Sequence, residues 1–519
     1  MMCSDCISVQ EGRHTGPDPN AGGTAGISYE WNPVPECSYC VPGRFCCIGK
    51  AVCIFLEMFR NRMSKYTKHV PKGETTMDFV SGVKEKAVLG IRDIRSGDYD
   101  GKTVHMNGAV HTIRQMGEIS FIVLRKAEGL VQCVYEGRES GFDIRELKEE
   151  STVEVTGTVR GEERAPQGFE IRLQGIRVLS KPAQPMPIAI SKWKLNTSLE
   201  TKLALRPISL RNIRERAKFK IQEGIVRGFR DYLFSQGFTE IHTPKIVARG
   251  AEGGSNVFRL DYFNKKAELG QSPQFYKQTM VGVYDRVFEA APVFRAEKHN
   301  TTRHLNEYTS LDFEMGYIDG FEDVMEMETG MLQYVMALLE QDYKKELDLL
   351  KVTLPDVSRI PAVRFDEAKR LVSEAYNRKI RNPYDLEPEE ELLIGRYFKE
   401  KSGSDFVFVT HYPSKKRPFY AMDDPQDPKF TLSFDLLLRG LEVTTGGQRI
   451  HDYDRIIEKM TRRGMDPQDI QSYLMIFKYG MPPHGGLGIG LERLTMRLLD
   501  EQNVRETCMF PRDVTRLEP

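Results

Sequence analysis

Five short runs of β-branched and aromatic residues lie between Lys84 and Leu179, separated by turns of glycine and charged residues. They predict strands over residues 103–112, 119–124, 131–135, 152–159 and 169–178. Five short strands with one brief helical insert are typical of a small Greek-key barrel of the OB type. Such barrels commonly bind single-stranded nucleic acid by stacking bases on exposed aromatic side chains. This stretch therefore constrains the first part of the chain to a small β domain.

The pattern changes after a proline-rich stretch, which contains Pro182, Pro185 and Pro187 and predicts a linker. Apolar residues then recur every four positions from Ile221 to Leu233, which predicts a long amphipathic helix that ends at Gly237. Further strands are expected over residues 239–243, 286–294, 309–315 and 406–410, and a helix from near Gly490 to about Leu499. The second part is therefore predicted as a larger domain of mixed helices and strands.

The first 70 residues differ from the rest, because seven of the nine cysteines lie within the first 53 residues. No helical or strand period is sustained there, so we expect a flexible extension. Cys3/Cys6 and Cys37/Cys40 offer four thiolates, a set that zinc prefers, but 30 residues separate the pairs. Zinc binding and a translation start upstream of Met63 or Met77 stay as alternatives.

The expected domains are an extension over 1–70, the barrel over 84–180, a linker over 181–205 and the large domain over 206–519.

The balance of charges and the lack of long apolar runs limit the kinds of partner that the chain can bind. Lys plus Arg and Asp plus Glu number 74 each, so any nucleic-acid surface must be a local cluster of basic groups. No apolar run reaches the roughly 20 residues that a membrane span requires, and the start of the chain does not resemble a secretion signal. We therefore expect a cytosolic protein without membrane segments, although the unusual first 70 residues leave import into an organelle open.

Three segments of the second half need a joint explanation. They are GFTEIHTPK (237–245), FRAEKHNTTRHLNEYTSLDFEM (294–315) and GGLGIGLERL (485–494). In this order they resemble the three signature motifs of class II aminoacyl-tRNA synthetases, and the resemblance covers roughly residues 84–519. It implies an α+β fold, in which the OB-fold barrel precedes a catalytic domain built on an antiparallel sheet flanked by helices.

Three further blocks narrow the resemblance within that class. Residues 251–278, 442–452 and 510–519 look like the aspartyl enzymes of the eukaryotic and archaeal type. The interval between Met315 and Gly485 is too short for the large extra domain of the bacterial aspartyl enzymes. The resemblance thus implies an aspartate-tRNA ligase, which activates L-aspartate with ATP to aspartyl-adenylate, releases pyrophosphate and transfers the aspartyl group to the 3′ end of tRNA(Asp).

The chemistry of activation explains why arginines are expected in the motifs. Joining a carboxylate to the α-phosphate of ATP brings two anions together, so fixed cations and metal ions should dominate catalysis. By resemblance, Arg295 would bridge the substrate carboxylate and the α-phosphate, and Arg493 would hold the γ-phosphate. The adenine would lie between the Tyr308 ring and the Arg493 guanidinium, and Glu297 and His304 would flank the nucleotide.

Selection of aspartate needs a charge, because asparagine has the same shape. Lys277 and Arg449 match the family residues that face the side-chain carboxylate, with Gln274 beside them. A buried cationic pair left unmatched by an amide should reject asparagine by roughly 10⁴-fold. The asparaginyl relatives usually lack a lysine at the position of Lys277. The α-ammonium would be held by Asp312 and by Glu252, which lies on a glycine-rich segment suited to a closing lid.

The metal pair and two departures from the family complete the predicted catalytic site. Asp435 and Glu442 match the family's magnesium ligands, with Glu442 also beside the ATP, because Mg²⁺ prefers hard oxygen ligands and keeps positions for phosphates and water. Ala251 and Thr445 stand where many relatives carry serine. Thr445 keeps a hydroxyl for the aspartate pocket, whereas Ala251 puts the detail of lid closure in doubt. No residue stands out as a general base.

The resemblance also implies how tRNA would be bound. In the barrel, Phe121 would stack on an anticodon base and Gln132 would read a base edge, with Glu170 as a third candidate. The basic loop with Lys298, His299 and Arg303 would enter the acceptor end of the tRNA. The first motif forms the subunit interface in this family, so a homodimer is expected.

Two alternatives remain at this stage. One is a relaxed enzyme that charges both tRNA(Asp) and tRNA(Asn), because anticodon stringency depends on the geometry of the barrel loops. The other is a non-catalytic paralogue that only binds RNA. A non-catalytic paralogue would be expected to have lost the ATP-binding residues. This sequence retains all four of them: Arg295, Asp435, Glu442 and Arg493.

Overall fold

The computed structural model describes residues 88–137, 142–250 and 256–518. The extension over 1–70 with its cysteine pairs, together with Ala251 and Glu252, lies outside the described residues. Within these ranges, no helix combines the length and the apolar character that crossing a membrane requires.

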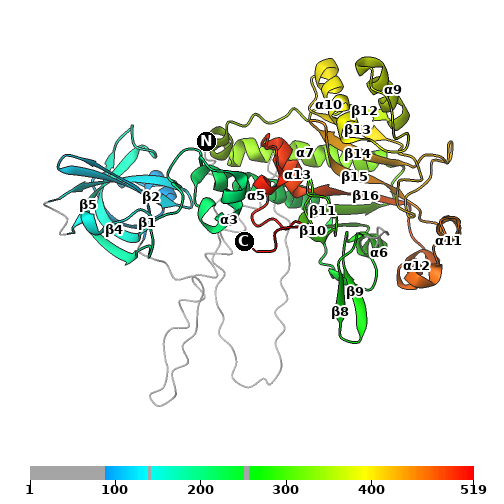
Figure 1. Ribbon diagram of the computed structural model, residues 1–519, viewed down its shortest axis with the longest axis horizontal. Coiled ribbons are helices and arrows are strands. Elements are labelled where there is room, and N and C mark those ends of the chain that lie inside the picture. Colours follow the sequence, from blue (N-terminus) through cyan, green and yellow to red (C-terminus); the bar gives the residue numbers. More distant parts are fainter. Residues whose placement is uncertain (1–87, 138–141, 251–255, 519) are drawn as a thin grey trace, which may run out of the picture. The chain divides into compact units, whose positions relative to one another are not determined.

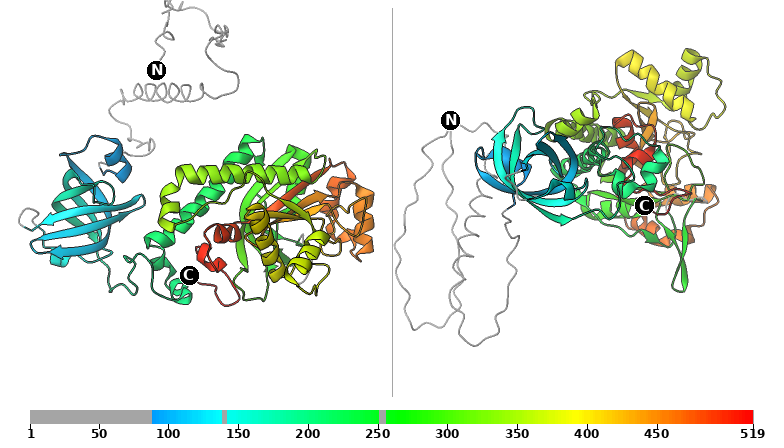
Figure 2. Two further views of the ribbon diagram at one scale, coloured as in Figure 1. Left: turned by 90° about the horizontal axis from the view of Figure 1, so that it is seen from above. Right: turned by 60° about the vertical axis from the view of Figure 1, so that its left-hand side comes forward.

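The first strand pattern forms the predicted closed barrel, in the order β1-β2-β3-β5-β4 (Figures 1 and 2). Successive side chains point to opposite sides of a strand, so Ile122 and Cys133 lie in the barrel core while Phe121 and Gln132 lie on its outer face. The bounds are α2 (Ile91–Ser96), β1 (Thr103–Met116), β2 (Ile119–Lys126), β3 (Gly129–Glu136), η2 (Ile144–Glu146), β4 (Thr152–Gly161) and β5 (Phe169–Ser180).

An eight-stranded sheet forms the centre of the second part, in the order β12-β13-β14-β15-β16-β11-β10-β6. Only the outer pairs β12/β13 and β6/β10 are parallel, so the predicted antiparallel sheet is confirmed. Its bounds are β6 (Thr239–Glu240), β10 (Arg286–Phe294), β11 (Glu307–Gly316), β12 (Ala362–Arg364), β13 (Phe406–Thr410), β14 (Ser433–Leu438), β15 (Leu441–Arg449) and β16 (His484–Gly490).

Strand β6 is shorter than the run over 239–243 suggests. The Thr243 N–H donates to the Glu289 carboxylate at 2.7 Å instead of to a strand, and Pro244 has no N–H to offer. The sheet pairing therefore ends early, and the chain turns toward a small separate sheet of β7 (Ile246–Val247), β9 (Lys265–Leu269) and β8 (Arg259–Tyr262).

Two long helices, α5 (Ile213–Ser235) and α7 (Glu322–Asp342), pack against each other and share one apolar core with the sheet (Figure 1). The side chain of Asn212 caps the start of α5, and Gly237, with φ of 77°, follows its end. The predicted stripe from Ile221 to Leu233 is buried against this core. The helices approach closely at Gly228, where a Cβ would lie 2.9 Å from Val335.

The remaining helices connect and flank the sheet. They are α3 (Leu199–Ala204), α4 (Arg206–Ser209), α6 (Gln274–Tyr284), α8 (Lys344–Leu350), α9 (Phe365–Tyr376), α10 (Pro388–Ser402), α11 (Tyr453–Arg462), η3 (Pro467–Ile470), α12 (Gln471–Lys478), α13 (Leu491–Leu498) and η4 (Val504–Thr507).

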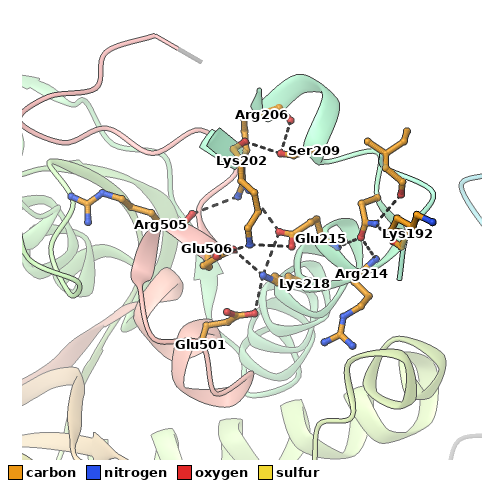
Figure 3. A network of polar contacts seen from close by, with 12 residues as sticks. Lys192, Lys202, Arg206, Ser209, Arg214, Glu215, Lys218, Glu501, Arg505 and Glu506 are labelled. Carbon is orange, nitrogen blue, oxygen red and sulfur yellow. Dashed lines mark hydrogen bonds and ion pairs between the residues drawn. The ribbon is translucent and has the colours of Figure 1, made fainter. Parts of the chain in front are cut away.

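A buried ion network ties the C-terminal segment to the start of α5 (Figure 3). The Lys218 ammonium lies 2.8 Å from Glu501 and 2.9 Å from Glu506, and Lys202 lies 2.7 Å from Glu506. Arg206 donates to the backbone carbonyls of the same segment, including Met509 O at 2.8 Å. These contacts hold α13, which carries Arg493, against α5.

Candidate active site

Lys277 projects from α6 onto the central strands of the sheet and is almost completely buried. Its Nζ lies 2.9 Å from Asp312 Oδ1 and 3.3 Å from Glu314 Oε2, both on β11, and donates to Leu487 O on β16 at 2.8 Å. Asp312 and Glu314 lie on the same side of β11, because side chains alternate along a strand. The ammonium is therefore held by two carboxylates and a carbonyl.

Arg449, the last residue of β15, completes a cluster of two cations and two anions. Its Nε lies 2.8 Å from Glu314 Oε1, and its second donor reaches Gly486 O at 2.8 Å. Burial alone would raise the pKa of Glu314, but the charges of Arg449 and Lys277 outweigh burial and hold the pKa below its usual value. Glu314 thus stays ionised and joins both cations. The predicted specificity pair therefore lies in one place.

Gln274 and Thr445 lie in two neighbouring parts of the site. Gln274, the first residue of α6, is buried and donates to Gln278 Oε1 at 3.0 Å. The Thr445 hydroxyl donates to Glu442 Oε1 at 3.2 Å, so it contacts the predicted metal ligand.

The predicted ATP residues come from β11, β15, α13 and the loop between β10 and β11. Arg493 on α13 donates to Arg303 O at 3.1 Å and lies 3.6 Å from Glu442 Oε1. His304 lies 3.7 Å from Glu297, and burial followed by the charge of Arg493 lowers the pKa of His304. These residues therefore share one neighbourhood.

Arg295 and Tyr308 lie at the two ends of the same loop. Asn306 joins these ends, because its side chain donates to Arg295 O at 2.7 Å and to Glu297 O at 2.9 Å. Tyr308 pairs with Val293 across β10 and β11 and packs beside Leu305. The loop that carries the expected nucleotide contacts is thus anchored at both ends to the sheet.

The predicted metal pair lies on adjacent strands, with Asp435 on β14 opposite Thr445 on β15, three residues after Glu442. Burial raises the pKa of Asp435 to about 6; Arg417, at 2.7 Å, opposes this effect and Glu442 adds to it. Two nearby carboxylates fit a hard cation, which would relieve their repulsion. Among the described residues no group of three or more His, Cys, Asp or Glu side chains could hold a metal ion, so a cation at these two carboxylates would need ligands of other kinds to complete its coordination.

Several residues of the site escaped the sequence interpretation. Glu391 on α10 binds Arg303 at 2.8 Å and lies 3.4 Å from the backbone N of Glu442, and burial raises the pKa of Glu391 to about 7. Glu314 could have been found, because Asp312 and Glu314 have the two-residue spacing of one strand face. Arg417 and Glu391 come from distant segments without such a signal.

The three predicted anticodon residues share the outer face of the barrel. Gln132 and Glu170 are paired between β3 and β5, and Gln132 Nε2 donates to Glu170 Oε2 at 3.1 Å. Phe121 lies opposite Val134, two residues further along β3, and is partly exposed. A partly exposed ring beside an amide and a carboxylate is a surface on which a base can stack and be read at its edge.

A polar cavity of about 900 Å³ lies beside the ion network at the start of α5. Lys194, Arg214, Lys351 and Arg439 line it together with that network, and none of the predicted site residues does. The site is therefore defined by its side-chain geometry and not by this cavity.

Comparison with known proteins supplies independent findings. The family model of tRNA synthetases class II (D, K and N) matches residues 198–514, and that of the OB-fold nucleic acid binding domain matches residues 104–179. The chain is 47% identical to the aspartate–tRNA(Asp/Asn) ligase of Deinococcus radiodurans, covering 81% of this chain and 97% of the relative. It is 40% identical to the aspartate–tRNA(Asp) ligase of Pyrococcus horikoshii, with the same coverage.

Solved structures are similar as well. The asparaginyl-tRNA synthetase of Pyrococcus horikoshii, complexed with asparaginyl-adenylate, superimposes with a TM-score of 0.75 at 31% identity, over 81% of this chain and 97% of that one.

Proposed function

Because the chain belongs to the class II tRNA synthetases of the aspartate, lysine and asparagine group, we propose that it is an aspartate-tRNA ligase. The observation that carries this proposal is the buried pair Lys277 and Arg449, joined by Glu314 in the centre of the sheet. Two fixed cations favour an amino acid with a second carboxylate, whereas the amide of asparagine would leave them unmatched.

In the first step, a carboxylate oxygen of aspartate attacks the α-phosphorus of ATP and the bond to pyrophosphate breaks. We assign Arg295 to the substrate carboxylate and the α-phosphate, and Arg493 to the γ-phosphate, because fixed guanidinium groups stabilise the charge that develops on phosphorus. Asp435 and Glu442 would hold Mg²⁺, which when bound neutralises phosphate charge. The adenine would lie between the Tyr308 ring and the Arg493 guanidinium, and Glu297 and His304 would flank the nucleotide.

In the second step, the terminal ribose hydroxyl of the tRNA attacks the carbonyl carbon of aspartyl-adenylate and AMP leaves. Phe121, Gln132 and Glu170 are the proposed readers of the anticodon, supported by their shared face of the barrel. The relatives divide on tRNA specificity: those of Deinococcus radiodurans and Thermus thermophilus are named for tRNA(Asp/Asn), and that of Pyrococcus horikoshii for tRNA(Asp) alone.

A homodimer is the proposed assembly. Apolar side chains are exposed at the ends of α5, α6 and β11: Phe234, Tyr284 and Tyr317. These ends lie together, because Arg286 donates to Gln236 O and the Gly316 N–H donates to Asp285 O. Sedimentation at equilibrium tests this assembly. The unmodified chain should have the mass of a dimer, and the Phe234→Asp variant should shift toward the mass of a monomer. A monomeric mass for the unmodified chain would contradict the proposal.

The charging reaction tests the function itself. Purified protein is incubated with ATP, aspartate and transcripts that carry aspartate or asparagine anticodons. Charging of the first transcript alone supports a discriminating enzyme, and charging of both supports the relaxed one. Binding of the transcripts without any charging would instead indicate a non-catalytic RNA-binding protein.

A further inference from the structure

A chain of buried hydrogen bonds runs from the proposed amino-acid pocket to the start of β16. Gln278 on α6 lies at its centre and is completely buried. Its Oε1 accepts hydrogen bonds from Gln274 Nε2 at 3.0 Å and from the Tyr473 hydroxyl at 2.9 Å. Its Nε2 lies 2.8 Å from His484 Nε2, and His484 Nδ1 lies 2.9 Å from Pro482 O. Of these side chains, only Gln274 belongs to the predicted aspartate pocket.

The direction of each hydrogen bond follows from the Pro482 carbonyl. A carbonyl oxygen only accepts, so His484 Nδ1 must carry a proton. Burial lowers the pKa of His484 to about 4, so the ring is neutral and its Nε2 is an acceptor. Gln278 must therefore turn its Nε2 toward His484 and its Oε1 toward Gln274 and Tyr473. In turn, Gln274 must turn its Nε2 toward Gln278, which leaves its own Oε1 as an acceptor.

The hydrogen bonds of Gln278 also fix the position of helix α6 against its neighbours. Lys277 lies between Gln274 and Gln278 in sequence and donates to Leu487 O on β16, so α6 contacts β16 through both Lys277 and Gln278. Tyr473, on α12, stacks on Phe275 of α6 with ring centroids 4.2 Å apart. The helix that carries the specificity lysine is thus oriented by polar contacts from two other elements.

We propose that Gln278 is a positioning residue for amino-acid activation: its amide, oriented by its contacts with His484 and Tyr473, fixes the orientation of Gln274 and holds α6 so that Lys277 meets the substrate. This inference rests on the proposed function. Gln274 then offers a carbonyl oxygen to the substrate. This acceptor can bind the ammonium group of an amino acid, whereas it would repel a carboxylate group.

Aspartate-dependent exchange of pyrophosphate into ATP, catalysed by the full chain, is the first test. In the Gln278→Met variant the side chain has similar size but no amide, so Gln274 loses its fixed partner. We expect the KM for aspartate to rise about tenfold or more, with the KM for ATP changed by less than about twofold. Gln333→Met is the matched control, because the Gln333 amide also donates hydrogen bonds, to Val357 O and Ser358 O, away from this network.

The second variant, Gln278→Glu, keeps the acceptor for Gln274 and Tyr473 but no longer donates to His484 when ionised. The glutamate at position 278 and His484 stay hydrogen-bonded while they share one proton. When that proton is lost, both groups are only acceptors and the contact is broken. The KM for aspartate should therefore rise with pH between about pH 6 and pH 9 relative to the unmodified enzyme. The other charged and titratable groups around His484 are unchanged in both proteins: they are Glu314, Arg449 and His451, together with Lys277, which contacts Glu314, and Tyr473, which contacts residue 278.

The outcomes separate this inference from the proposed function. If the unmodified chain shows no aspartate-dependent exchange, the proposed function fails. If it is active, an unchanged KM for aspartate in folded Gln278→Met would overturn the positioning role, as would an equal rise in the KM for ATP. Should Gln278→Met fail to fold, the pH profile of Gln278→Glu decides: a profile parallel to that of the unmodified enzyme overturns the inference.

Discussion

The ammonium of Lys277 lies 2.9 Å from the carboxylate of Asp312, and both side chains are almost completely buried. The two residues proposed to bind opposite ends of aspartate thus form an ion pair with each other. Aspartate carries both complementary groups, so its side-chain carboxylate can replace Asp312 beside Lys277 while its ammonium replaces Lys277 beside Asp312. Exchange of one buried ion pair for two avoids leaving any charge unmatched during binding.

Removal of Lys277 should therefore abolish aspartate activation. In Lys277→Ala, the substrate carboxylate and the carboxylates of Asp312 and Glu314 would meet with only Arg449 to balance them. We expect aspartate-dependent pyrophosphate exchange to fall by at least about 100-fold, since an uncompensated buried charge costs roughly 3–5 kcal/mol. ATP binding, measured by calorimetry, should stay largely intact.

Lys344→Ala serves as the control for that experiment, because Lys344 is a largely exposed lysine on α8. It should leave both measurements unchanged. Unaltered pyrophosphate exchange in Lys277→Ala would contradict the assignment of the pocket.

Glu328 should make the protein less stable as the pH rises. This side chain on α7 is completely buried, and its carboxyl accepts one hydrogen bond from Thr444 at 2.6 Å. Burial raises the pKa of Glu328 to about 8. A glutamate in the unfolded chain ionises near pH 4.3, so between these values the folded state binds more protons and stability falls as pH rises, by roughly 2 kcal/mol from about pH 6 to pH 8.

The Glu328→Gln variant keeps the acceptor but cannot ionise, so this part of the pH dependence should disappear. Thermal unfolding midpoints at about pH 6 and pH 8 measure the effect. The exposed neighbour Glu326 provides the control, as Glu326→Gln should retain the decline of the unmodified protein. Equal declines in all three proteins would show that Glu328 is ionised in the folded state.

Asp435 should govern the affinity for the divalent cation. Asn in its place keeps the shape but removes one of the two carboxylate charges, so Arg417 would face Glu442 alone. We expect Mn²⁺ binding in the presence of ATP, followed by electron paramagnetic resonance, to weaken by about tenfold or more in Asp435→Asn. Asp348→Asn, at an exposed position of α8, is the matched control. Equal affinities in the two variants would place the metal elsewhere.

Much of the fold followed from local patterns, whereas parts of the site did not. The strands over 286–294 and 406–410 were predicted with their observed bounds, because each run is mostly apolar and is bounded by polar residues or turns. In the structure, the two-residue alternation of β2 and β3 places Ile122 and Cys133 in the barrel core and Phe121 and Gln132 on its outer face. Such patterns depend only on neighbours in the chain.

Contacts between distant segments carry no comparable signal. Arg303 and Glu391 are 88 residues apart, and Gln278 and His484 are 206 apart. Nothing around Glu391 in the sequence distinguishes it from the other glutamates of α10, since only the packing of α10 beside β15 brings it to Glu442.

Phe121 should contribute to tRNA binding through stacking. Its ring is partly exposed on the outer face of the barrel, close to the Gln132 and Glu170 pair, so it can meet a base without prior rearrangement of the strand. Loss of one base–aromatic stack costs roughly 1–3 kcal/mol. In Phe121→Ala, the KM for the tRNA(Asp) transcript should therefore rise by about 5-fold to 150-fold, while pyrophosphate exchange, which needs no tRNA, stays unchanged. Phe263→Ala removes an equally large ring that is 91% exposed on the turn between β8 and β9, and should leave the KM for tRNA unaltered. If the two variants behaved alike, the outer face of the barrel at Phe121 would not be the surface that binds the anticodon.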